Sequence, residues 1–352
     1  MVSKLSPRYR MIIAGLIFGA VAALMSTLGN PPNMGVCIAC FYRDITGALG
    51  LHRAAIVQYL RPEIMGIALG AFIAALAFGE FRSRGGSAPL VRFLLGAFFM
   101  IGALVFLGCP VRAVLRLAGG DLNAIAGLAG VVVGALAGIF FLRQGFNLGR
   151  SHPAYAAAGW IGPIIMLGLL LLAIVKPKFI FSSQEGPGAA HALLVISLVA
   201  GLVIGFLAQR TRMCFVGGWR DLFLVKDTYL FSGIAAFFVG ALIVNAATGA
   251  IHVGFANQPI AHTNTLWNFL GMVLAGLTAT LLGGCPLRQT VLASEGDADA
   301  AITIAGMMAG AAFAHNWLLA SSAKGVGEFG PIAVVIGLVV AGAIGFSMRE
   351  AA

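Results

Sequence analysis

Ten runs of about 18 or more apolar residues occur along this 352-residue chain, and a run of that length is what an α-helix needs to cross the hydrocarbon core of a bilayer. The 22 Lys and Arg plus the 12 Asp and Glu give 34 charged residues, about one in ten, whereas soluble domains carry about a quarter. A water-soluble globule is therefore excluded, and the sequence predicts an all-α polytopic membrane protein. The predicted spans cover residues 11–28, 62–81, 90–107, 121–142, 157–175, 190–208, 229–249, 265–283, 298–318 and 330–347.

Four further segments have a helical pattern but are short and carry arginine. We predict that they are re-entrant half-helices, because irregular backbone at membrane depth is tolerated only inside protein or around a cavity. An arginine in a membrane interior costs about 2.5 to 3.5 kcal/mol even on the lenient insertion scale, so these segments are the candidate functional region. They cover residues 37–50, 109–118, 212–226 and 285–294, and they contain Arg43, Arg112, Arg116, Arg220 and Arg288.

The distribution of Lys and Arg predicts the orientation of the chain. If the N-terminus is cytoplasmic, twelve of the 22 lie at cytoplasmic span ends, five lie at the opposite ends, Arg61 among them, and five lie in the short segments. An excess of this kind follows the positive-inside rule. We therefore expect a multi-pass protein with both termini in the cytoplasm.

Two cysteine motifs occur twice in the same order, which predicts an internal duplication. Residues 37–44 (CIACFYRD) align with residues 214–221 (CFVGGWRD) at an offset of 177, and residues 108–112 (GCPVR) align with residues 284–288 (GCPLR) at an offset of 176. Five predicted spans separate the starts of the two copies, so the second copy is inverted, as in many secondary transporters. We place repeat one at 11–145, a connecting span and loop at 146–188, repeat two at 189–318 and a last span at 330–347.

The Gly-Cys-Pro motifs predict two anion-attracting helix ends. Proline suits the first position of a helix, which makes Cys109 and Cys285 the N-cap residues. The unpaired N–H groups and the dipole at such an end attract anions and favour a thiolate. Each of these half-helices is predicted to stop at a Gly-Asp pair, Gly120-Asp121 or Gly296-Asp297, with the Asp capping the next span.

Cys37 and Cys214 are predicted to head the other two half-helices, and each precedes an Arg-Asp pair by six residues. Neighbouring residues on a helix do not face each other, so we expect both arginines to point toward a pore while Asp44 and Asp221 bind other partners. The candidate substrate-binding residues are Cys37, Cys109, Cys214, Cys285, Arg43, Arg112, Arg220 and Arg288.

Cys40 forms a C-x-x-C with Cys37, but its counterpart in the second copy is Gly217. A small buried apolar role is therefore the expected one for Cys40. A C-x-x-C is also typical of redox pairs and of half a zinc site. The sequence lacks a second C-x-x-C and a histidine cluster, so we expect no metal.

These features resemble the YeeE/YedE (TsuA-like) family of bacterial inner-membrane transporters over most of the chain. The resemblance implies an hourglass-shaped path in which cysteines pass an anion along through transient S–H to sulfur hydrogen bonds, with Cys109 and Cys285 as the first relay candidates and Cys37 and Cys214 next. It also implies a cytosolic partner, a small TusA/SirA-like sulfur-carrier protein. The similarity is closest to the YedE branch assigned to selenium transport, in residues 37–52, 61–64, 106–112, 115–124 and 258–263.

We therefore expect a transporter, with no enzymatic activity and no cofactor, that imports a small sulfur- or selenium-containing inorganic anion such as a selenium compound or thiosulfate. The residues do not separate selenium from sulfur, because the two elements have similar size and chemistry. Two alternatives stay open. A membrane thiol oxidoreductase would form disulfides between Cys37 and Cys40 or between Cys109 and Cys285, and a passive anion channel would show flux that does not saturate.

Overall fold

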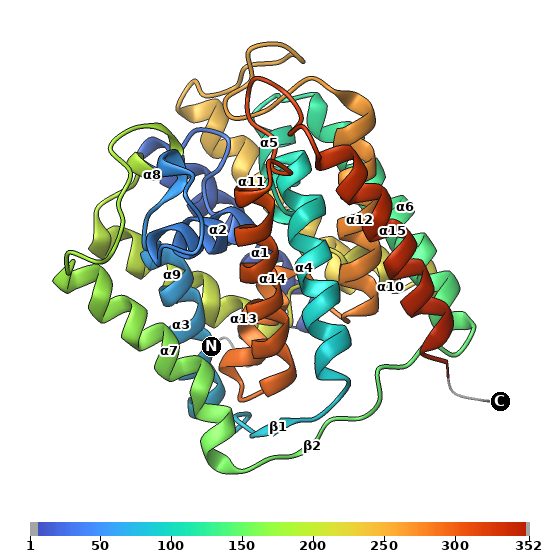
Figure 1. Ribbon diagram of the computed structural model, residues 1–352. Helices are drawn as coiled ribbons and strands as arrows, with labels where there is room; N and C mark the ends of the chain where they lie inside the picture. Colours follow the sequence, from blue (N-terminus) through green and yellow to red (C-terminus); the bar gives the residue numbers. More distant parts are fainter. Residues whose placement is uncertain (1–5, 350–352) are drawn as a thin grey trace.

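The computed structural model describes residues 6–349, and most of this part of the chain is helical (Figure 1). Within it, ten stretches are long and apolar enough to cross a membrane, so the predicted all-α polytopic fold is confirmed. Each predicted span coincides with one helix, with ends that differ by a few residues. These helices are α1 (Pro7–Thr27), α3 (Pro62–Ala77), α4 (Pro89–Phe106), α6 (Asn123–Arg143), α7 (Ala156–Val175), α9 (Leu194–Thr211), α11 (Tyr229–Ala247), α12 (Thr265–Leu281), α14 (Ala298–Asn316) and α15 (Gly330–Ser347).

The four short segments are helices of 8 to 11 residues. They are α2 (Ile38–Ala48), α5 (Pro110–Ala118), α10 (Gly217–Leu224) and α13 (Pro286–Ser294). The prediction for α10 is wrong at its start, because Arg212 ends α9 in a left-handed conformation (φ 59°) and the chain turns before it becomes helical again. Smaller elements are η2 (Ala55–Val57), α8 (Gly186–Ala189), and the antiparallel strands β1 (Arg84–Gly85) and β2 (His152–Pro153).

The spanning helices of the two copies pack reciprocally. Helix α1 lies against α11 while α9 lies against α3, and α4 lies against α14 while α12 lies against α6. The close approaches repeat as well: a Cβ added at Gly19 would lie 2.0 Å from the Phe237 carbonyl oxygen, and one at Gly205 would lie 2.0 Å from the Ile67 carbonyl oxygen. Only glycine permits backbones this close. Such exchange of partners is what two copies related by a two-fold axis produce.

Two helices depart from this reciprocity. Helix α7 packs on α3, α13 and α14, whereas α15 packs on α4, α12 and α6. In Figure 1, α7 (green) and α15 (red) lie on opposite sides of the bundle. These helices flank the reciprocally packed core, in which α2, α5 and α13 are largely buried, whereas α10 is partly exposed.

The turns that follow α5 and α13 are held in the same way at opposite ends of the molecule. Each turn contains a glycine with positive φ, Gly120 (92°) or Gly296 (95°), as the predicted helix stops require. Backbone N–H groups of residues 252–254 donate to the first turn, and those of residues 82–84 donate to the second. We call the end with the 252–254 loop the loop end, and the end with β1 and β2 the strand end.

Candidate functional site

Three cysteines from two half-helices meet in the core. Cys37 is the N-cap of α2, and its sulfur accepts a hydrogen bond from the Cys40 N–H at 3.4 Å. The Cys37 sulfur lies 2.9 Å from the Cys40 sulfur and 3.8 Å from that of Cys109, the N-cap of α5. All three thiols are free and fully buried. The structure thus includes Cys40 in the cluster, although its expected role was apolar packing.

Arg112 adds a positive charge to these cysteines. Its guanidinium donates to the carbonyl oxygens of Asn33 (2.8 Å), Ile260 (3.0 Å) and Leu107, and it lies 3.5 Å from the Cys40 sulfur. The side chain is fully buried, and no carboxylate in the described part of the chain forms an ion pair with it. We call Cys37, Cys40, Cys109 and Arg112 the first cysteine cluster. A buried cation held by neutral carbonyls keeps its charge available to an anion.

The other arginine of α5 is neutralised. Arg116 lies one turn after Arg112, and its Nε pairs with Asp121 at 2.7 Å. The guanidinium also donates to the Phe106 carbonyl oxygen at 2.9 Å and lies 4.2 Å from the centre of the Phe106 ring. Arg116 therefore has a structural role, and Arg112 is the cation of α5 that remains uncompensated.

The prediction that Arg43 and Arg220 point away from their neighbouring aspartates is wrong. Arg43 pairs with Asp44 at 2.6 Å, and Arg220 pairs with its own neighbour Asp221 at 2.8 Å. An arginine side chain is long enough to fold back along its helix, and pairing avoids an uncompensated buried charge. Asp44 does bind a second partner, the Arg61 Nε at 2.7 Å. Arg61 is the N-cap of α3, at the predicted span end, but its side chain is fully buried.

Cys214 and Cys285 form the corresponding arrangement in the second copy. The Cys214 sulfur accepts hydrogen bonds from the N–H groups of Gly217 (3.2 Å) and Cys285 (3.3 Å), and the Cys285 sulfur accepts one from the Phe215 N–H (3.4 Å). Cys285 is the predicted N-cap of α13. Cys214 does not head a helix, since it lies three residues before α10, but its sulfur still binds the first N–H of that helix.

A carboxylate compensates the arginine of this second pair. Arg288 lies 3.5 Å from Glu295, which also contacts Arg212 (3.2 Å) and Arg84 (3.6 Å). Glu295 is 1% exposed, and its counterpart in the first copy is Gly119. We call Cys214, Cys285 and Arg288 the second cysteine cluster.

A polar contact connects the half-helices of the two clusters. The Tyr42 hydroxyl on α2 lies 2.9 Å from the Thr290 hydroxyl on α13, and both side chains are buried. Tyr42 follows Cys37 by five residues, and Thr290 follows Cys285 by five. The two clusters therefore flank one shared central region of the bundle.

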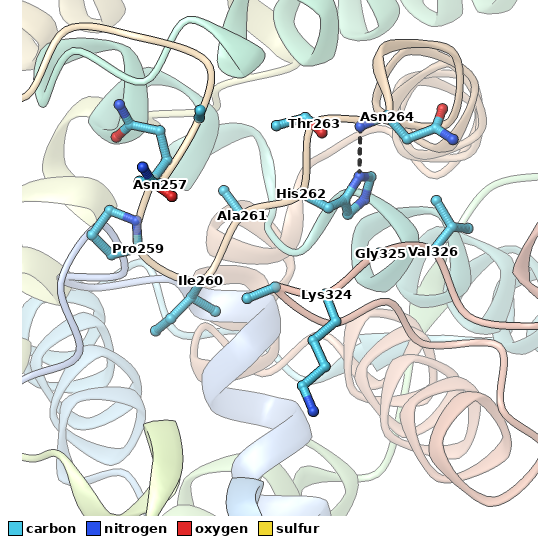
Figure 2. A pocket seen from close by; sticks show the side chains of 13 residues that line it. Asn257, Pro259, Ile260, Ala261, His262, Thr263, Asn264, Lys324, Gly325 and Val326 are labelled. Atoms are coloured by element: carbon cyan, nitrogen blue, oxygen red, sulfur yellow. Dashed lines mark hydrogen bonds between the residues drawn. The ribbon is translucent and has the colours of Figure 1, made fainter.

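A pocket of about 1050 Å³ opens at the loop end, lined by residues 256–264 and 323–326 (Figure 2). Ile260 lines it, and the carbonyl oxygen of the same residue binds Arg112, so this loop separates the pocket from the first cysteine cluster. Ile260 has a φ of 50°, which is strained for a β-branched residue. Burial lowers the pKa of His262, whose Nε2 donates to the Val105 carbonyl oxygen at 2.8 Å.

Three residues of the site were absent from the predicted set. Cys40 had a signal in its C-x-x-C spacing, and Arg61 lies in the Arg-Pro-Glu stretch that carries the family resemblance. The signal for Glu295 was an acidic residue that ends an apolar half-helix. Arg288 precedes it by seven residues on the same half-helix, but Arg84 and Arg212 come from distant parts of the chain, so no local pattern indicated those two.

Comparison with known proteins finds relatives of part of this chain. Residues 210–345 match the model of a family described as Sulphur transport. Over 99 residues the chain is 34% identical to the thiosulfate transporter TsuA of Spirochaeta thermophila, and over 106 residues it is 30% identical to the thiosulfate transporter TsuA of Escherichia coli. These segments cover 28% and 30% of this chain. They span 29% of the length of each relative, well under two thirds.

Proposed function

We propose that this chain belongs to the YeeE/YedE family and imports a small sulfur- or selenium-containing inorganic anion across the bacterial cytoplasmic membrane. Thiosulfate is the first candidate because both matched relatives are named thiosulfate transporters. A selenium compound is the second, from the resemblance to the selenium branch. The observation that carries the proposal is Arg112, a fully buried cation that has no carboxylate partner within residues 6–349 and lies beside three free thiols.

The chemistry of the first cysteine cluster suits a small anion. Arg112 supplies charge, the N-terminus of α5 supplies unpaired N–H groups, and the thiols supply weak S–H donors. Weak donors favour rapid release, which a transport path needs at each of several sites. In this proposal the anion passes from the first cluster, by way of the region around Tyr42 and Thr290, to the second cluster.

We infer that the loop end faces the periplasm and the strand end the cytoplasm, with both chain termini cytoplasmic. The excess of Lys and Arg at the strand-end span termini supports this orientation. The loop-end pocket is then the entrance, and Lys324 on its wall attracts anions. A TusA/SirA-like carrier protein would receive the sulfur at the strand end, a partner that rests on the family resemblance.

The test is uptake of labelled thiosulfate and labelled selenite, each competed with the other, in cells that express the protein. Wild type is compared with Cys109→Ala and Cys285→Ala at matched membrane levels, and Ser347→Ala, at the exposed end of α15, is the control. We expect saturable uptake of one anion by wild type and the control and its collapse in both cysteine variants. Uptake that survives both substitutions, or no uptake of either anion by wild type, contradicts the proposal.

A thiol oxidoreductase is the second candidate, favoured by the 2.9 Å approach of the Cys37 and Cys40 sulfurs. Cys40 distinguishes the two candidates. Disulfide exchange needs both sulfurs of the Cys37–Cys40 pair, whereas an anion relay does not need Cys40, which has no counterpart in the second copy. We expect Cys40→Ala to retain most of the uptake. Loss of function in Cys40→Ala, together with a thiol-dependent gel shift of wild type under oxidant, would favour the oxidoreductase.

A further inference from the structure

The carboxyl group of Glu63 is buried in the core outside both cysteine clusters. Glu63 lies in the first turn of α3 and has no exposed surface. Its Oε1 accepts hydrogen bonds from Asn30 Nδ2 at 2.7 Å and from Ser197 Oγ at 2.9 Å. Its Oε2 is buried and has no hydrogen-bond partner within residues 6–349.

No cation neutralises this carboxyl group among the described residues. The nearest arginine in sequence, Arg61, donates instead to Asp44 (2.7 Å) and to the carbonyl oxygens of Pro187 (2.7 Å) and Ala190 (3.0 Å). A buried carboxylate with one oxygen unpaired is costly, whereas the protonated group carries no charge. The unpaired Oε2 is therefore the oxygen of this carboxyl group at which a proton can be bound.

The second copy shows that helix packing does not need an acid at this position. Where α9 packs on α3, a Cβ added at Gly201 would lie 2.3 Å from the Glu63 carbonyl oxygen. In the reciprocal contact of α1 with α11, a Cβ added at Gly15 would lie 2.3 Å from the Gly233 carbonyl oxygen. Gly233 therefore corresponds to Glu63. A side chain at Gly233 would meet the Met11 sulfur, so the same contact in the second copy is apolar.

We propose that Glu63 is a proton-binding site whose loading and release accompany each anion transported, an inference that rests on the proposed function. A proton suits the site better than a sodium ion, because the site offers one free oxygen and a metal cation of this type needs several oxygen ligands. Asn30 and Ser197 present donors to Glu63 rather than additional acceptors.

The Asn30 amide connects this proton to the first cysteine cluster. Its Nδ2 donates both to Glu63 and to the Gly35 carbonyl oxygen at 2.9 Å, two residues before Cys37. Its Oδ1 accepts from the Ala192 N–H at 3.0 Å, next to the start of α9. Loss of the proton would place a full negative charge on the acceptor of this amide. The hydrogen bonds from Asn30 to the segment before Cys37 and to the start of α9 would both change.

Few other ionisable groups surround the site. On the chain leading into α3 these are Tyr59 and Arg61, and Arg61 is bound to Asp44 of α2. The segment before α9 contributes His191, whose ring stacks on Tyr59 at 4.2 Å. The side chain that α9 itself presents to Glu63 is Ser197, which does not titrate in the physiological range. Of these groups, Glu63 is the one hydrogen-bonded to Asn30 and so connected to the segment before Cys37.

The test uses the full chain reconstituted in liposomes and two transport assays. The first measures exchange of labelled for unlabelled thiosulfate, or selenite, without a gradient, and the second measures accumulation driven by an acidic exterior, with a trapped pH dye to follow protons. Glu63→Gln keeps the shape and one acceptor oxygen but does not titrate. Glu328→Gln, an exposed acid at the loop end, is the matched control.

We expect wild type and the control to accumulate about tenfold more anion for each pH unit of the gradient and each proton carried. Glu63→Gln should lose this accumulation, while its exchange rate stays within about twofold of the wild-type rate. In infrared difference spectra, wild type minus Glu63→Gln should show the C=O band of a protonated carboxyl. Proton-driven accumulation by Glu63→Gln, loss of its exchange as well, or absence of that band would overturn the inference. If wild type neither exchanges nor accumulates either anion, the proposed function fails, and the infrared band alone then decides whether Glu63 holds a proton.

Discussion

The two cysteine clusters are built from the same motif but carry different charge. In both, a Gly-Cys-Pro-x-Arg segment begins a half-helix and a cysteine from the other motif lies against it. Arg112 of the first cluster has carbonyl partners, whereas Arg288 of the second is compensated by Glu295. The duplicated residues place the sulfur atoms and helix ends, while a residue that was not duplicated sets the electrostatics.

This difference suggests a division of labour along the path. The first cluster combines an uncompensated cation with three thiols and should hold an anion more tightly. The second cluster has two thiols and an arginine that already has a carboxylate within 3.5 Å, so it should release an anion more readily. Conduction needs binding that is favourable enough for entry and weak enough for exit. The predictions below test this asymmetry, from the largest effect to the smallest.

The largest expected difference is between Arg112→Gln and Arg288→Gln. A hydrogen bond to a charged group contributes about 1.5 to 3 kcal/mol, so loss of the Arg112 charge should lower uptake at low substrate concentration by about 10- to 150-fold. Loss of Arg288 should have a smaller effect, because Glu295, which Arg288 shares with Arg84 and Arg212, already offsets part of its charge. Initial uptake rates at matched membrane levels measure both variants, and equal losses would refute the asymmetry.

Glu295→Gln should convert the second cluster toward the first. Removal of the carboxylate frees Arg288, and a more tightly held anion leaves more slowly, so both KM and the maximal uptake rate should fall several-fold. Three arginines contact Glu295, so the variant also loses stability, and thermal unfolding of the purified protein must be compared alongside. A higher KM in a protein that is still folded would speak against the proposed release site.

The two ends of the molecule should differ in acid sensitivity, which is the smallest effect. Burial lowers the pKa of His262 at the loop end, so its neutral folded form contributes stability that is lost as pH falls below the ordinary value of 6.5. At the strand end, burial raises the pKa of Glu80, but hydrogen bonds from Gln209 and Arg210 outweigh burial and lower this pKa overall. The stability that ionised Glu80 contributes is therefore lost only as pH falls below about 4.5. Hydrogen exchange across a pH series should show residues 252–264 losing protection first. Simultaneous loss at both ends would remove this distinction.

Much of the fold was predictable because membrane helices and their interruptions depend on local sequence. The apolar runs predicted the spans, and the prolines after Cys109 and Cys285 predicted where two half-helices begin. The charge pairing was not predictable, since Arg84 and Glu295 are 211 residues apart and meet only after the copies exchange partners. The same holds for Arg61, which looks like an outer-loop cation until Asp44 is placed beside it.

The central claim, that the transported anion binds first beside Arg112, is tested most directly by locating a selenium-containing anion in crystals of the protein by anomalous scattering. We predict a selenium peak within hydrogen-bond distance of Arg112 and next to Cys109, and its absence in Arg112→Gln crystals. A peak confined to the second cysteine cluster, or unchanged in Arg112→Gln, would contradict the account.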